Sequence, residues 1–76
     1  MSPEELEEFL KRQPFQPFVI HMSNGRTYHV RHPEAATLTM DAVHVGVYAA
    51  DDRYPKALRA LTLVNINELE PLTTAN

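Results

Sequence analysis

Residues 18–31 have the sequence FVIHMSNGRTYHVR, in which two apolar-rich stretches flank an Asn-Gly dipeptide. Such a dipeptide between strand-forming residues is typical of a β-hairpin. A two-residue turn would mix charged and apolar side chains on one face of this hairpin. A three-residue loop over 23–25, with Gly25 in the left-handed conformation, instead pairs Ile20 with Tyr28 and gathers the apolar side chains on one face. Because a slip of one residue turns every side chain to the other face, the burial pattern favours the three-residue loop.

A helix is predicted over residues 1–13, before the hairpin. Ser2 is a favourable N-cap, and Glu5 three residues later completes the sequence pattern of a capping box. Pro14 prevents the helix from continuing. An apolar stripe at helical spacing is formed by Leu6, Phe9 and Leu10. A helix of this length is marginal alone, so we expect it to pack on a sheet.

Three further strands are predicted after the hairpin, over 43–48, 58–63 and 66–70. The segment 34–42 is ambiguous, because its alternating apolar pattern breaks at Asp41-Ala42, which indicates a turn or a bulge. We therefore expect an α+β chain, mainly β. Its N-terminal helix should pack on a strongly bent antiparallel sheet of about five strands.

The composition excludes several classes of protein. The chain has 76 residues, ten acidic and seven basic side chains, a net charge of −3 and no cysteine. This length fits one domain, so we assign residues 1–76 to a single unit, with the helix at 1–13, a sheet or barrel at 15–71 and a frayed tail at 72–76. The absence of cysteine fits a cytoplasmic protein. No apolar run approaches the roughly 18 residues that a membrane-spanning helix needs, so we expect no membrane partner.

Two segments resemble the small β-barrels of the Sm-like, SH3-type class. Residues 18–25, FVIHMSNG, are similar to the first strand of that family and its glycine-containing turn. Residues 61–71, LTLVNINELEP, are similar to its last two strands and their short connection. With PFQPF at 14–18 and VRHPE at 30–34, the chain also resembles a group of short uncharacterised bacterial proteins. The resemblance implies a small barrel, and it implies ring assembly and RNA binding, because Sm-like proteins do both.

Four histidines raise the question of a metal site. In the favoured register, His21 and His29 are diagonal neighbours on the exposed face of the hairpin. A zinc site needs three or four convergent ligands, so these two are weak candidates and we expect neither a metal nor another cofactor. No nucleophile is placed beside an activating base, and neither glycine belongs to a phosphate-binding loop. We therefore expect a protein without enzymatic activity.

The function that the sequence supports best is that of a binding or assembly module. Its apolar side chains outnumber what one short helix covers, and a small barrel leaves an open sheet edge for a strand of another chain. We therefore expect self-association, or binding of another protein, through a sheet edge or an apolar patch. Candidate interface residues are Val43, Val45, Val47, Leu61 and Leu63. The open alternative is that all of these side chains fill one compact core.

Binding of RNA or another single-stranded nucleic acid is the second functional hypothesis. Basic side chains are interleaved with tyrosines, and these are the residue types of a surface that stacks bases and contacts phosphates. The candidate residues are Arg26, Arg31, Arg53, Tyr54 and Lys56. The net charge of −3 and the acidic helix weigh against this hypothesis, because such binding depends on a basic groove.

Overall fold

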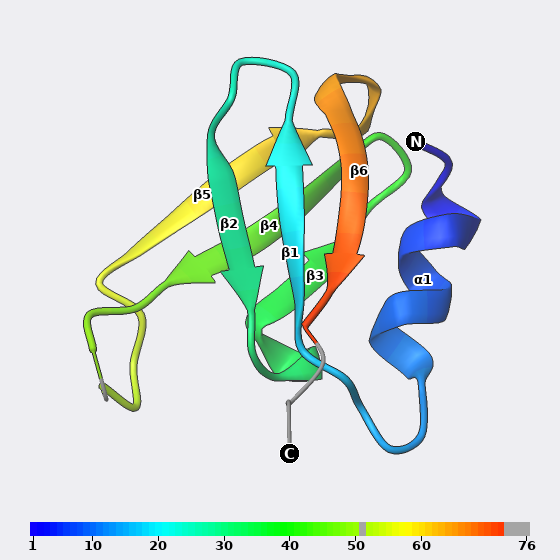
Figure 1. The fold of residues 1–76 in the computed structure, drawn as a ribbon. Helices are drawn as coiled ribbons and strands as arrows, with labels where there is room; N and C mark the ends of the chain where they lie inside the picture. Colours follow the sequence, from blue (N-terminus) through cyan, green and yellow to red (C-terminus); the bar gives the residue numbers. More distant parts are fainter. Residues whose placement is uncertain (51, 73–76) are drawn as a thin grey trace.

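The fold was obtained as a computed structural model, which describes residues 1–50 and 52–72. One helix, six strands and two short 3-10 helices follow one another along these residues. They are α1 (Pro3–Lys11), β1 (Phe18–Met22), β2 (Thr27–Val30), η1 (Pro33–Ala35), β3 (Ala36–Leu38), β4 (Ala42–Val47), β5 (Ala57–Thr62), η2 (Leu63–Asn65) and β6 (Ile66–Pro71) (Figure 1). None of the helices in the described ranges is long and apolar enough to cross a membrane.

The strands form two antiparallel sheets of three strands each, in the orders β2-β1-β6 and β3-β4-β5. The second sheet crosses obliquely behind the first (Figure 1). The predicted α+β class with an N-terminal helix is confirmed, but two sheets replace the expected single sheet of about five strands. The difference arises where β2 leads through η1 into β3. Pro33 opens η1 and has no N–H for a ladder, so the chain leaves one sheet there and enters the other.

The hairpin of β1 and β2 has the predicted register. Ile20 lies opposite Tyr28, and Phe18 lies opposite Val30. The N–H of Gly25 donates to the carbonyl of Met22 across 3.0 Å, and Gly25 has a φ of 88°. A residue with a side chain adopts this left-handed conformation only at a cost, so the glycine fixes the bulged loop and with it the register.

Helix α1 begins as predicted. The Glu5 backbone N–H donates to the Ser2 hydroxyl across 3.3 Å, and the Ser2 backbone N–H donates to the Glu5 carboxylate across 3.2 Å. This reciprocal capping box satisfies two of the free N–H groups at the helix start. Leu6 is fully buried against the sheets, while Arg12 lies with its guanidinium carbon 4.2 Å from the centre of the Phe9 ring.

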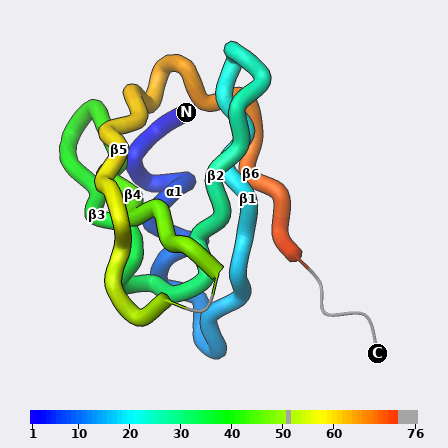
Figure 2. The backbone as a smooth tube through the Cα atoms, turned by 90° about the vertical axis from the view of Figure 1, so that its left-hand side faces the viewer, coloured from blue at the N-terminus to red at the C-terminus, as the bar shows by residue number. Residues whose placement is uncertain are grey.

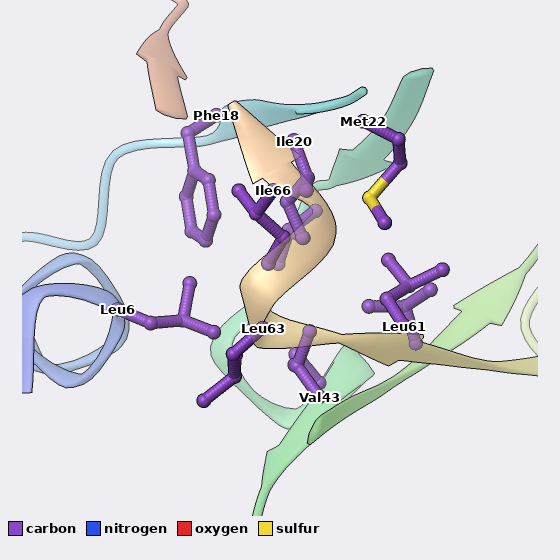
Figure 3. Packing of buried hydrophobic residues seen from close by; sticks show 11 residues of the cluster. Leu6, Phe18, Ile20, Met22, Val43, Leu61, Leu63 and Ile66 are labelled. Atoms are coloured by element: carbon purple, nitrogen blue, oxygen red, sulfur yellow. The ribbon is translucent and has the colours of Figure 1, made fainter. Parts of the chain in front are cut away.

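The core lies between the two sheets, and α1 closes one end of it. Figure 3 shows Leu6 approaching from the helix, Phe18 and Ile20 from one sheet and Val43 from the other. The side chains that are buried in this cluster are Leu6, Phe18, Ile20, Met22, Val30, Ala36, Val43, Val45, Leu61, Leu63 and Ile66. T-shaped packing of the Phe9 ring on Phe18, with centroids 5.1 Å apart, extends the core toward the outer turn of the helix.

The structure places the candidate interface residues and one residue of the predicted tail. Four of the five candidate interface residues are core residues of a single chain, because β4, β5 and the start of η2 direct these side chains into the core. They are Val43, Val45, Leu61 and Leu63. The predicted frayed tail at 72–76 lies outside the described residues except for Leu72, whose backbone N–H donates to the carbonyl of Pro17 across 2.8 Å.

Candidate functional site

A cleft of about 610 Å³ opens between β2 and the end of β4. Strands β2 and β4 contact each other across the two sheets, and Figure 2 shows the path of their backbones. Strand β2 contributes Thr27, Tyr28 and His29, and the segment after it contributes Arg31, His32 and Glu34. The opposite wall is formed by the end of β4 and the loop that follows, with Gly46, Val47, Tyr48, Ala49, Asp52 and Arg53. The volume is within the range of roughly 300–1,000 Å³ that is usual for ligand sites.

The shape of this cleft depends on a glycine in β4. A Cβ atom on Gly46 would lie 2.9 Å from Cε1 of Tyr48 and 3.2 Å from Cβ of Pro55. The missing side chain therefore lets the Tyr48 ring and Pro55 lie close against the strand. A glycine inside a strand often marks such a close approach of another part of the chain.

The charges around the cleft are balanced. Arg31 and Arg53 each bring a guanidinium group, whereas Glu34 and Asp52 each bring a carboxylate. With neutral histidines, these four formal charges cancel. The cleft is therefore polar and aromatic without being a basic groove, and it lacks the excess of positive charge that draws in a phosphate backbone.

The predicted nucleic-acid residues gather only in part. Arg31 and Arg53 line the cleft together with Tyr28 and Tyr48. The other candidates do not line it. Arg26 lies at the hairpin turn, where its backbone N–H donates to the side-chain oxygen of Asn24, and both Tyr54 and Lys56 are exposed. The sequence did not indicate the two carboxylates of the cleft, because Glu34 and Asp52 are distant in the chain and belong to no motif.

The two histidines that were weak metal candidates have different surroundings. Nε2 of His21 lies 2.8 Å from a carboxylate oxygen of Glu70 on β6. His29 is on β2, which pairs with the opposite side of β1 and borders the cleft. The ring of His21 is therefore directed away from His29. Over residues 1–50 and 52–72, no group of three or more potential ligands could hold a metal ion.

The edge of β5 is a second candidate site. The backbone N–H of Leu63 donates to the carbonyl of Asp41, and the residues of β4 and β5 stay directly opposite one another from there on. Hydrogen-bonded pairs alternate with non-bonded pairs in an antiparallel ladder. Along β5, Ala57, Arg59 and Leu61 thus direct their backbone groups toward β4. The residues that direct them to the open edge are Leu58, Ala60 and Thr62.

The four strands that end the two sheets differ in how they are protected from pairing with the same strand of a second copy. Strand β3 has three residues and β2 has four, while β6 carries two glutamates and ends at a proline. Short length, charge and proline all disfavour pairing at an edge. Strand β5 has six residues, ALRALT, with one charge and no proline. It also leaves Leu58 69% exposed, so β5 is the edge with the least protection.

Comparisons with protein-family models, with curated proteins and with solved structures found no match to this chain.

Proposed function

We propose that this protein is a small assembly module in which two copies associate by pairing their β5 strands. The unprotected edge of β5 carries this proposal. Antiparallel pairing of two β5 strands about a two-fold axis would join the β3-β4-β5 sheets of the two copies into one continuous sheet. The free N–H and C=O groups of Leu58 and Ala60 would then gain partners, and the exposed Leu58 side chain would be covered.

The order of elements supports a further part of the proposal, that the two sheets are the halves of a small barrel of the Sm-like, SH3-type class. Strand β2 continues through η1 into β3, and β5 continues through the single turn η2 into β6. Strand β6 then returns to pair with β1. One chain path thus connects the sheets at both sides of a shared core, as it does in a barrel.

Measurement of molecular mass as a function of concentration tests the assembly. We expect light scattering to show a dimer at high micromolar concentration. Leu58→Lys should weaken this dimer by about tenfold or more, which corresponds to about 1.4 kcal/mol, because a lysine on each copy opposes pairing at the edge. Leu58 is largely exposed, so the monomer should fold as before.

Val64→Lys is the matched control. Val64 is 81% exposed and lies in η2, outside the strand, so this variant adds the same charge away from the proposed interface. It should dimerise like the unmodified chain. A monomer at every concentration, or equal weakening by both lysine variants, would contradict the proposal.

Single-strand nucleic-acid binding remains the alternative function, and it has weaker support. Two arginines and two tyrosines share the cleft, which favours it, but Glu34 and Asp52 offset their charge. A fluorescence anisotropy titration with oligo(U) at low salt decides this alternative. A flat titration would exclude it, and tight binding that falls steeply with salt would support it.

A further inference from the structure

The edge of β2 that faces the cleft carries free backbone groups. The N–H of Met22 donates to the carbonyl of Arg26 across 2.9 Å at the start of the β1–β2 ladder. Bonded and non-bonded pairs alternate along the ladder, so the next bonded pair after Met22 and Arg26 is Ile20 and Tyr28. Tyr28 therefore bonds to β1. Thr27 and His29 direct their N–H and C=O groups away from β1, toward the outer edge of β2. Within the part of the chain that the structure describes, β2 ends its sheet, so these groups have no ladder partner, and both residues line the cleft.

The chemistry of this wall matches a polypeptide backbone. Thr27 and His29 present donors and acceptors two residues apart, and an extended peptide offers the complementary groups at the same spacing. A phosphodiester backbone has no N–H donor for the free carbonyls, and the carboxylates of Glu34 and Asp52 oppose its charge. Of the two classes of macromolecule, the cleft favours the peptide.

We propose that this cleft is a binding site for an extended peptide segment of another protein, which adds to the free edge of β2 as a strand. Alternate side chains of such a strand point to the same face. The peptide side chains that point to the same side of the sheet as Tyr28 would enter the cleft, where Tyr48 forms part of the opposite wall. The segment therefore carries an apolar or aromatic residue at an alternate position, with polar residues on either side that pair with Arg31 and Glu34.

This site is independent of the proposed dimer. The cleft borders β2 in one sheet, whereas β5 ends the other sheet, and β4 lies between β5 and β3. Peptide binding and self-association can thus succeed or fail separately.

The test starts with selection of random nine-residue peptides, displayed on phage, against the full chain. A selected peptide is then synthesised and added to ¹⁵N-labelled protein for amide hydrogen exchange. At a peptide concentration of about ten times Kd, exchange at Thr27 and His29 should slow about tenfold, since only the free fraction exchanges. The amides of Leu58 and Ala60 should not change in the same experiment. Protection confined to β5, or failure to select any peptide, would overturn the proposal.

N-methylation of the peptide gives a second readout that leaves the protein unaltered. Methylation at alternate residues should abolish binding, because those N–H groups donate to β2, while methylation at the residues between them should have little effect. Binding that tolerates methylation at every position would refute strand addition. A nine-residue oligo(U) that binds more tightly than the peptide and displaces it would assign the cleft to nucleic acid instead.

His29→Pro tests the same edge from the protein side. It removes one N–H that faces the cleft and no N–H that bonds to β1, since His29 and Val19 form a non-bonded pair of the ladder. Peptide affinity should fall by about tenfold or more. If this variant does not fold, the methylated peptides decide alone.

Discussion

The backbone N–H of Leu63 donates to the carbonyl of Asp41 across 2.9 Å, and this bond sets the phase of the whole β4–β5 ladder. Because bonded and non-bonded pairs alternate, it determines that Ala60 faces the open edge and Leu61 faces β4. Two neighbouring residues thus have opposite roles, one available for pairing with a second chain and one committed to the fold.

Ala60→Pro should separate these roles. The substitution removes an N–H that has no ladder partner among residues 1–50 and 52–72, and proline is tolerated at an edge when its missing N–H faces solvent. The variant should fold and remain monomeric, whereas Leu61→Pro should not fold, because it removes a ladder bond and a buried side chain. Circular dichroism and light scattering check both outcomes. A dimer that survives in Ala60→Pro would place the interface elsewhere.

Hydrogen exchange of the unmodified chain offers a second check on the edge. In dilute solution the amide of Ala60 should exchange much faster than that of Leu61, because only the latter is hydrogen-bonded. As the protein concentration rises, the Ala60 amide should become protected through dimerisation. Exchange at Ala60 that does not depend on concentration would argue against pairing through β5.

Leu6→Ala should destabilise the chain by about 2–5 kcal/mol, since Leu6 is fully buried at the point where α1 meets the core. A domain of this size is stable by roughly 4–11 kcal/mol, so the loss is a large part of the total. Leu10→Ala provides the comparison. Leu10 is only partly buried, so Leu10→Ala should lower the free energy of unfolding by less than Leu6→Ala does. Urea denaturation measures both variants. Equal losses would mean that the helix is not anchored through Leu6.

The sequence predicted the features that depend on neighbouring residues. The hairpin register followed from a pattern of period two around Gly25, and the helix start followed from Ser2 and Glu5. Strand β3 was not predicted, because three residues are too few to establish a period and its pairing partner is β4. Apolar composition also could not separate the buried Val43 from the exposed Leu58, since that difference arises only when β4 and β5 pack on the other sheet.

The cleft shows the same limit. Arg31 and Arg53 were recognised as candidates by residue type, and the structure does place both there. Their carboxylate neighbours come from Glu34, just after β2, and Asp52, in the loop after β4. Only the crossing of the two sheets brings these segments together, so the charge balance that favours a peptide over a nucleic acid could not be predicted from the sequence.

The capping box should make stability depend on pH. The backbone N–H and then the hydroxyl of Ser2 hydrogen-bond to the Glu5 carboxylate, and these contacts hold its pKa below the usual 4.5. A lowered pKa in the folded state adds stability that is present above the unfolded pKa and is lost as the pH falls through the folded pKa. The advantage of the unmodified chain over Glu5→Gln should therefore shrink on acidification. Ser2→Ala should cost about 1 kcal/mol at neutral pH. Urea unfolding at about pH 7 and about pH 3 measures the free energy of unfolding of the unmodified chain and of each variant. A difference between the unmodified chain and Glu5→Gln that grows in acid would contradict this role of Glu5.

Gly46→Ala should destabilise the chain, although alanine is favoured over glycine in a strand by about 0.5–1 kcal/mol in general. The added Cβ would meet Pro55 at 3.2 Å, where a rigid ring cannot easily move, and Tyr48 at 2.9 Å, where the ring can shift. Crowding of this kind costs about 1–3 kcal/mol, so it outweighs the gain.

Gly25→Ala is the control, because it strains a backbone of positive φ but adds a methyl group to open space. Both variants should lose stability in urea, but only Gly46→Ala should change the NMR signals of the Tyr48 ring and lower the affinity for a peptide in the cleft. A Gly46→Ala variant that is more stable than the unmodified chain would show that the close approach of Tyr48 and Pro55 does not shape this wall.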